Sequence, residues 1–178
     1  MKLALIPILI FTANVYGSPV KLSNIEKGWT VHTVVPGTED AKISGNSDAI
    51  INFNETANGT LATVYVFELP TPANLKLGED TEPWHGILFG KAAKTKVSVV
   101  SERTYNVNGQ WRYIIEFQPD TGTMLNSIAM ATLIDGKLHV MSLEQNRTLF
   151  NQLASSVRKL MKNVEIAPEP TAKEQVKK

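Results

Sequence analysis

The chain has 178 residues, a formal net charge of +1 and no cysteine. Its length is that of one ordinary domain, with enough residues to bury a core without disulfide bonds. The lack of cysteine excludes a thiol nucleophile, a cysteine-based zinc site and a redox role. Its 18 basic residues nearly balance its 17 acidic residues, so the basic excess that nucleic acid binding requires is missing and no nucleic acid partner is expected.

Residues 1–17 have the layout of a secretory signal peptide. Lys2 gives a charged start, an apolar run spans Leu3–Phe11, and a small-x-small cleavage site ends at Gly17. The apolar run is much shorter than the roughly 20 residues that a membrane-spanning helix needs. We therefore expect cleavage after Gly17, a periplasmic or secreted mature protein, and no stable insertion in the membrane.

Segments with β propensity dominate the first part of the remaining chain. Residues 18–27 are polar and are expected to be a lead-in segment. Extended structure is predicted for residues 30–35, 49–53 and 60–69. The last two are expected to form a hairpin, because Asn58-Gly59 between them can adopt the positive φ angles of a tight turn.

A short helix is predicted to begin near Pro83. Proline suits the first helical turn, and Trp84, Ile87 and Leu88 recur at helical spacing. The acidic residues of the preceding segment, 73–83, indicate a solvated connection between the two halves of the domain.

Four consecutive strands are predicted between Val97 and Leu143, and we expect this meander to organise the fold. Asn108-Gly109 and Asp135-Gly136 are strong signals for two-residue hairpins. Residues 127–134 are apolar at nearly every position, as expected for a central strand buried on both faces. The strand that precedes them places four apolar residues on one face: Trp111, Tyr113, Ile115 and Phe117.

An amphipathic helix follows and is expected to cover this aromatic face. Asn146 is a suitable N-cap. The apolar stripe of the helix consists of Leu149, Phe150, Leu153, Val157, Leu160 and Met161. A short edge strand is predicted at residues 164–166, and residues 167–178, with two prolines and alternating charges, are expected to form a disordered tail.

These elements predict one α+β domain over residues 28–166, in which helices cover an antiparallel sheet. The sequence segments occur in the order Gly28-Trp29, Ile50–Phe53, Thr63–Val66, Gly109–Phe117, Ala129–Thr132 and Asp135–Met141, before the final helix. This order resembles the Mog1/PsbP family. The resemblance implies an α/β/α sandwich that is used mostly to bind other proteins or to support assemblies, without a shared catalytic set. No site is transferred from the family, because no functional motif matches.

Four residues are candidates for contact with a partner. Trp84, His85 and Glu82 lie where the acidic connection meets the predicted helix, and Arg112 lies on the strand face opposite Trp111. Aromatic residues and arginine contribute much of the binding energy in protein complexes. Burial between helix and sheet is the simpler interpretation for Trp111 and, less strongly, for Trp84. Arg112 is expected to be an exposed contact.

The same region contains groups that could form a metal site. Glu79, Asp80, Glu82 and His85 carry oxygen and imidazole groups that could bind a divalent cation. The simpler interpretation is that acidic residues ahead of a helix offset its dipole and keep the connection solvated. Their spacing fits no specific metal motif, so neither a metal nor another cofactor is expected.

A hydrolase is a further alternative, because His32, His85 and His139 occur alongside many serines. No serine lies in a Gly-x-Ser-x-Gly elbow, and His139 falls inside a predicted strand. We therefore expect no catalytic residues and no enzyme activity. The expected function is that of a non-catalytic exported protein that binds a protein partner or supports an envelope assembly, with an inhibitor or immunity protein as one form. A small-ligand-binding module and, less favoured, a small hydrolase remain alternatives.

Overall fold

The computed structural model of the chain describes residues 20–33, 49–53, 59–69, 71, 75, 84–85, 88, 97–119 and 125–168. The expected signal peptide and most of the expected tail lie outside these residues. In chain order the elements are β1 (Val20–Ser23), β2 (Trp29–Thr33), β3 (Ala49–Phe53), β4 (Ala62–Leu69), β5 (Val97–Val107), β6 (Gln110–Pro119), β7 (Leu125–Ile134), β8 (Lys137–Asn146), α3 (Arg147–Asn163) and β9 (Glu165–Pro168).

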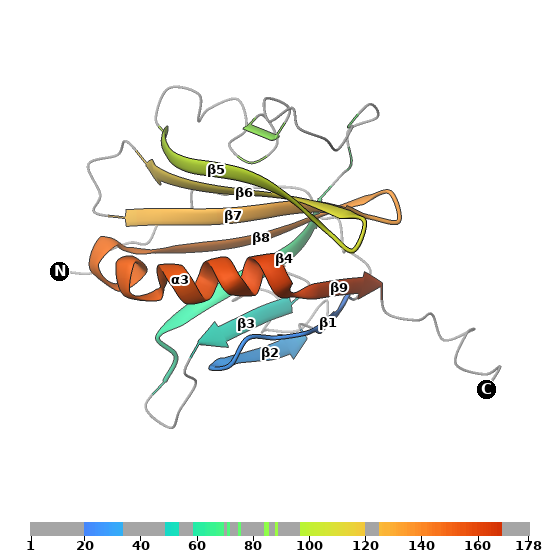
Figure 1. Ribbon diagram of the computed structural model, residues 1–178. Coiled ribbons are helices and arrows are strands. Elements are labelled where there is room, and N and C mark those ends of the chain that lie inside the picture. The colour runs from blue at the N-terminus through green and yellow to red at the C-terminus, as the bar shows by residue number, and fades with distance from the viewer. Residues whose placement is uncertain are drawn as a thin grey trace.

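Seven of these strands form one antiparallel sheet with the order β2-β3-β4-β8-β7-β6-β5 (Figure 1). The meander β5 to β8 makes up one side of this sheet, as predicted from the sequence. Its last strand, β8, pairs with β4 and so joins the meander to the N-terminal strands. The strand β5 consequently lies at one edge of the sheet and β2 at the other.

Two tight turns fix the register of the meander. At the first, Asn108 and Gly109 have φ angles of 53° and 83°, and at the second, Asp135 and Gly136 have φ angles of 50° and 76°. Positive φ at both central residues is the requirement of the turn type that matches the twist of two paired strands. The side chain of Asn106 strengthens the first turn by accepting a hydrogen bond from the Gly109 amide at 3.0 Å.

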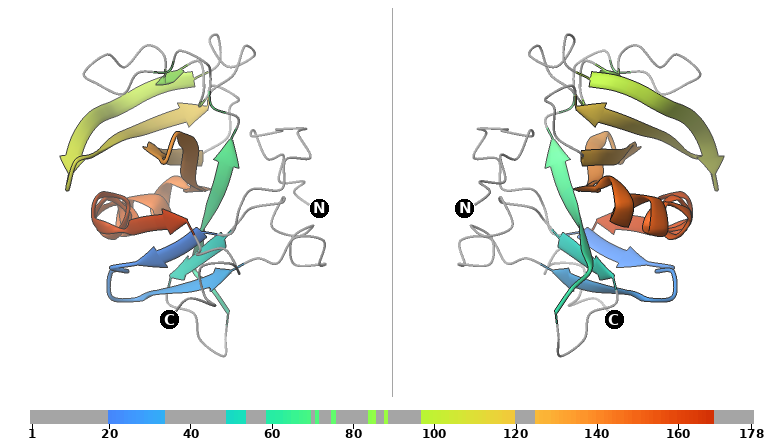
Figure 2. Two further views of the ribbon diagram at one scale, coloured as in Figure 1. Left: turned by 90° about the vertical axis from the view of Figure 1, so that its right-hand side faces the viewer. Right: turned by 90° about the vertical axis from the view of Figure 1, so that its left-hand side faces the viewer.

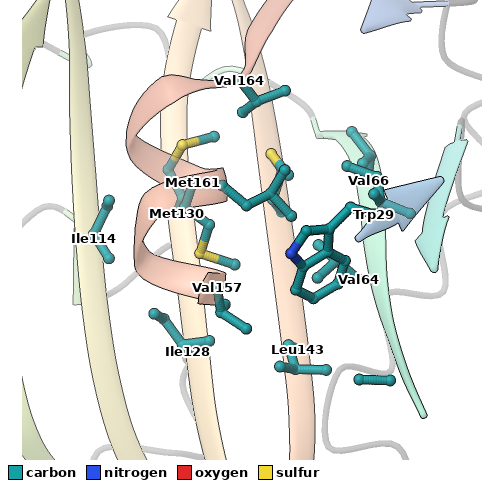
Figure 3. Packing of buried hydrophobic residues seen from close by; sticks show 14 of the residues in the cluster. Trp29, Val64, Val66, Ile114, Ile128, Met130, Leu143, Val157, Met161 and Val164 are labelled. Atoms are coloured by element: carbon teal, nitrogen blue, oxygen red, sulfur yellow. The ribbon is translucent and has the colours of Figure 1, made fainter. Parts of the chain in front are cut away.

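The helix α3 begins after Asn146, whose side chain accepts a hydrogen bond from the Leu149 amide at 3.0 Å. The predicted cap is therefore present. Its buried stripe consists of Phe150, Leu153, Ala154, Val157, Leu160 and Met161. These residues pack on Ile114, Ile128, Met130 and Leu143 in the principal core cluster (Figure 3).

Polar contacts also hold α3 in place on the sheet. The indole Nε1 of Trp29 donates a hydrogen bond to Ser156 Oγ at 2.8 Å. The guanidinium of Arg158 donates two hydrogen bonds, at 2.6 and 2.7 Å, to the two carboxylate oxygens of Glu116. Paired bonds of this kind fix direction as well as distance, so they orient the helix relative to β6.

The face of the sheet that packs against α3 is not the aromatic face of β6. Tyr113, Ile115 and Phe117 belong to a second apolar cluster, together with Trp84 and Leu88. Alternate residues of a strand point to opposite faces, and α3 packs on the alternate set. The expectation that the terminal helix buries the aromatic side chains of β6 is therefore wrong, because both faces of the meander are apolar and strand periodicity does not say which one the helix will meet.

A small second sheet joins the two ends of the described chain. β1 and β9 pair in antiparallel register from Val20↔Pro168 to Ser23↔Glu165. Val20 and Ile166 are buried in the same core cluster as α3, and the pair lies on the helix side of the large sheet (Figure 2). The predicted edge strand at residues 164–166 thus extends into the expected tail, and the expected lead-in segment contains its partner strand.

The fold is α+β and is dominated by antiparallel sheet, with one long helix among the described elements. The short helix predicted near Pro83 is represented by Trp84, His85 and Leu88, which have helical conformation. Within the residues described, no helix is both long and apolar enough to cross a membrane.

Candidate functional site

Trp84 is a core residue. Its side chain is 1% exposed and stacks on the ring of Tyr113, with the two centroids 5.7 Å apart and the planes 23° apart. Trp111, which the sequence favours for the core, is only half-buried. The indole of Trp84 therefore anchors its segment to the sheet and has no surface left for a partner.

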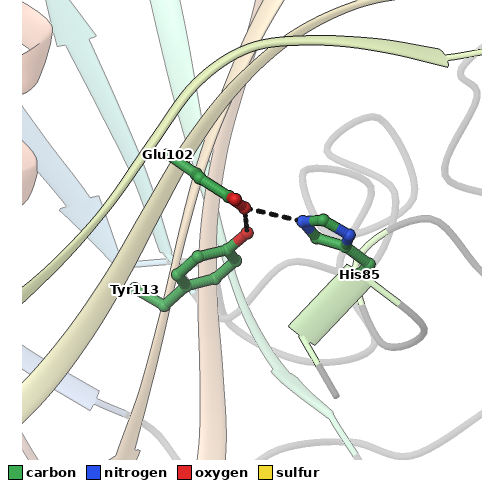
Figure 4. A network of polar contacts seen from close by, with 3 residues as sticks. All are labelled: His85, Glu102 and Tyr113. Atoms are coloured by element: carbon green, nitrogen blue, oxygen red, sulfur yellow. Dashed lines mark hydrogen bonds and ion pairs between the residues drawn. The ribbon is translucent and has the colours of Figure 1, made fainter. Parts of the chain in front are cut away.

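His85 takes part in a three-residue network at the edge of the sheet (Figure 4). Its Nε2 lies 2.7 Å from Glu102 Oε2, and the Tyr113 hydroxyl donates a hydrogen bond of 2.6 Å to the same oxygen. Glu102 comes from β5 and Tyr113 from β6. The network thus connects the helical residues 84–85 to the last two strands of the sheet.

The contacts of the network shift the pKa values of Glu102 and Tyr113. The hydrogen bond from Tyr113, followed by that from His85, lowers the pKa of Glu102 below its ordinary value. Burial, followed by the hydrogen bond to Glu102, raises the pKa of Tyr113. Glu102 is therefore ionised and Tyr113 protonated at neutral pH, so the carboxylate of Glu102 is a negative group held in a fixed position at the surface.

Glu102, which bears this negative charge, lies on β5 at one edge of the sheet. It is the last strand in the sheet order and pairs with β6 alone among the described strands. Val99 is 44% exposed and Val100 is 55% exposed. In the described part of the chain only Leu61 is another large apolar residue with comparable exposure. An edge strand with unpaired backbone groups and exposed apolar side chains is a template for pairing with another chain.

A β-bulge interrupts the register of β5 between Val99 and Ser101. Val99 pairs with Phe117 and Glu102 pairs with Ile115, two positions further along β6. Residues three apart on a regular strand face opposite sides, whereas the bulge brings Val99 and Glu102 to the same face. Bulges of this kind re-aim side chains, often next to functional sites.

Arg112 is not the exposed contact that the sequence predicts. It is 2% exposed and its Nη1 donates hydrogen bonds to the carbonyl oxygens of Met161 and Lys162, at 3.2 and 2.6 Å. Removal from water lowers its pKa. Arg112 therefore serves the C-terminal end of α3, where a cation complements the helix dipole.

Polar side chains continue from Arg112 along a cross-strand row, since Arg112 pairs with Thr132 and Thr132 pairs with His139. His139 is 3% exposed, and its Nδ1 has no hydrogen-bond partner. Burial lowers the pKa of His139. The imidazole of His139 is therefore neutral and shielded from solvent, and it is a poor candidate for the general base of a hydrolase.

No protein-family model matches the chain, and no curated protein sequence matches it. The fold is similar to that of cyanobacterial PsbP (CyanoP) from Synechocystis sp. PCC 6803, with a TM-score of 0.53 and 13% identity over 90% of this chain and 100% of that chain. The chain has a PsbP-like fold. At this level of identity the similarity concerns the fold alone.

Two further solved structures are less similar to this PsbP-like chain. PA94, a protein of unknown function and putative regulator from Pseudomonas aeruginosa, has a TM-score of 0.48 and 8% identity over 87% of this chain and 86% of its own. LpqN, involved in cell envelope biogenesis of Mycobacterium tuberculosis, has a TM-score of 0.49 and 13% identity over 85% of this chain and 86% of its own.

The PsbP-like fold separates the residues that the sequence groups together. Trp84 and His85 lie on the aromatic side of the sheet, Arg112 lies on the helix side, and Glu82 is outside the described residues. Of the four residues weighed as metal ligands, only His85 is among the described residues, and it contacts Glu102; the residues described contain no cluster of three potential ligands.

Sequence reasoning missed Glu102 and the edge at Val99 and Val100. The alternation of apolar and polar residues shifts by one position at Val99 and Val100, and this shift was the one feature of the sequence that indicated an irregular strand there.

Proposed function

We propose that the protein is a non-catalytic exported protein that binds a protein partner through the outer edge of β5. The observation that carries this proposal is the exposure of Val99 and Val100 on an edge strand that pairs on one side only among the described strands. Adjacent apolar side chains are costly to leave in water, and an edge strand offers a row of backbone donors and acceptors beside them.

The His85–Glu102–Tyr113 network supports binding more than chemistry. Both hydrogen bonds converge on Oε2 of one carboxylate, and the tyrosine keeps its proton. A carboxylate held in this way is a fixed contact point, since it needs little reordering when a partner arrives. Export is proposed from the signal-peptide layout of residues 1–17, and a role in an envelope assembly or as an inhibitor is consistent with such binding.

We also propose that the segment containing Trp84 and Leu88 forms the helical layer on the second face of the sheet. Both side chains are buried against Tyr113 and Ile115. This layer would complete the α/β/α sandwich and would hold His85 against β5.

A photo-crosslinking residue at position 100 tests the binding proposal. The mature protein would be expressed with p-benzoylphenylalanine in place of Val100, irradiated in cells of its own host, and examined for crosslinked products by mass spectrometry. We expect one discrete crosslinked protein. The matched control has the same residue in place of Leu61, which is 51% exposed and precedes β4, so that β8, β7 and β6 separate it from β5 in the sheet.

The variant Val100→Glu provides the second arm, with Leu61→Glu as its control. Val100→Glu should abolish co-purification of the crosslinked protein while the melting temperature stays close to that of the unaltered protein. Equal crosslinking from positions 61 and 100 would remove β5 as the site. A complete lack of crosslinked protein from position 100 would overturn the proposal that the partner is a protein bound at this edge.

A further inference from the structure

We propose that the partner of β5 is an extended segment that adds to the sheet as a further strand and places a lysine or arginine next to Glu102. This inference rests on the proposed function and specifies the chemistry of the partner. It follows from three features of the β5 edge: its backbone pairing, its bulge and its fixed carboxylate.

The backbone favours an extended partner. β5 has 11 residues and hydrogen-bonds to β6 on one side, and it has no second neighbour among the described strands. When a peptide adds to such an edge, main-chain hydrogen bonds supply affinity, and the pockets or charges that meet alternate side chains supply specificity.

The bulge sets the spacing of the β5 side chains that an added strand would contact. Val99 and Glu102 share a face and lie beside Phe117 and Ile115, which are two residues apart on β6. A strand added on the outer side would meet them at the same spacing, because its own side chains also alternate with a period of two. The partner should therefore carry an apolar residue and a basic residue separated by one position.

The carboxylate explains the basic residue. Oε2 of Glu102 accepts the bonds from Tyr113 and His85, and neither bond uses Oε1. The side chain is 36% exposed, so Oε1 can meet a cation at the surface without full loss of its water. Charge pairs of this kind contribute more to the choice of partner than to the strength of binding.

A second copy of the chain fits this edge poorly. In a symmetric antiparallel pair of β5 strands, residues of the same face meet each other across the two-fold axis. Beyond the bulge, that face carries Glu102, Thr104 and Asn106, whereas Arg103 pairs with Ile114 on the helix side. Among the residues of β5, a symmetric antiparallel pair would therefore bring no cation to Glu102, and we infer a different protein as the occupant.

Selection from a phage-displayed library of random nine-residue peptides tests this inference. We expect the peptides enriched on the mature protein to share an apolar-x-basic or basic-x-apolar pattern. A synthetic peptide of the enriched sequence should bind Glu102→Gln about two- to five-fold more weakly, the range for a partly exposed charge pair. When bound, the unmethylated peptide should slow hydrogen exchange in β5. N-methylation of alternate backbone amides of the peptide should abolish binding.

Several outcomes would overturn the inference. Enriched peptides without a shared basic position, or equal affinity for Glu102→Gln, would exclude the cation contact. Binding that survives N-methylation on both sets of alternate amides would exclude strand addition.

If Glu102→Gln fails to fold, the same peptide with its basic residue replaced by glutamate is tested on the unaltered protein. The affinity of this peptide then decides whether the cation contact exists. A dimer in sedimentation velocity that Val100→Glu dissociates would also overturn the inference in favour of self-association. The crosslinking experiment at position 100 is independent of these results, so a different mode of binding at β5 would be recognised as such.

Discussion

Replacement of Trp84 by alanine tests the second apolar cluster, which holds the segment of His85 against the sheet. The indole is 1% exposed and stacks on Tyr113. Truncation of a buried tryptophan to alanine typically costs about 3–5 kcal/mol in unfolding free energy. In a domain of this size each kcal/mol lowers the melting temperature by roughly 2–4 °C. We therefore expect Trp84→Ala to melt roughly 6–20 °C lower than the unaltered protein.

Trp111→Ala is the matched control. The sequence favours Trp111 for the core, with a predicted cost of about 3–5 kcal/mol. The structure leaves it half-buried, so less apolar surface returns to water and we expect a loss of about 1–2 kcal/mol. Urea unfolding followed by far-ultraviolet circular dichroism measures both values without relying on tryptophan fluorescence. A smaller loss for Trp84→Ala than for Trp111→Ala would refute the assignment of Trp84 to the core.

Two further predictions concern pH. Burial lowers the pKa of His139 below its ordinary value of 6.5. As pH falls through 6.5, the unfolded chain therefore binds a proton that the native state does not, and the free energy of unfolding decreases. The variant His139→Leu should remove this loss, so its melting temperature should fall less between pH 7.5 and 5.5. Burial raises the pKa of Glu144 above 4.5, so its ionised form destabilises the native state at pH 7. Glu144→Gln should therefore raise the melting temperature by a few degrees at pH 7, with the gain shrinking as pH falls towards 4.5, and an equal gain at both pH values would contradict this assignment.

Local sequence chemistry determined the elements of the meander and the terminal helix. Asn108-Gly109 and Asp135-Gly136 adopt positive φ angles that few other residues tolerate. Asn146 satisfies an amide at the start of α3 that would otherwise lack a partner. These interactions involve residues close in sequence, and for that reason they can be predicted without the fold.

Contacts between distant residues decided the rest. The prediction that Arg112 is exposed is wrong because the end of α3 lies over β6. There the carbonyl oxygens of Met161 and Lys162, which are 49 and 50 positions later in the chain, accept its hydrogen bonds. The side of the sheet that receives α3 also depends on the packing of the whole chain, since the helix meets the face of β6 that carries Arg112, Ile114 and Glu116 and leaves the aromatic face to the second apolar cluster.

The candidate site shows the same division. His85 was recognisable from the sequence, but its contact with Glu102 joins two segments 17 residues apart, and the exposure of Val99 and Val100 follows from the position of β5 at the end of the sheet. The amino-acid pattern thus determined which residues form strands, turns and helix. Only the tertiary structure decided which strand lies at the edge, because strand order depends on pairings between distant segments that strand periodicity does not encode.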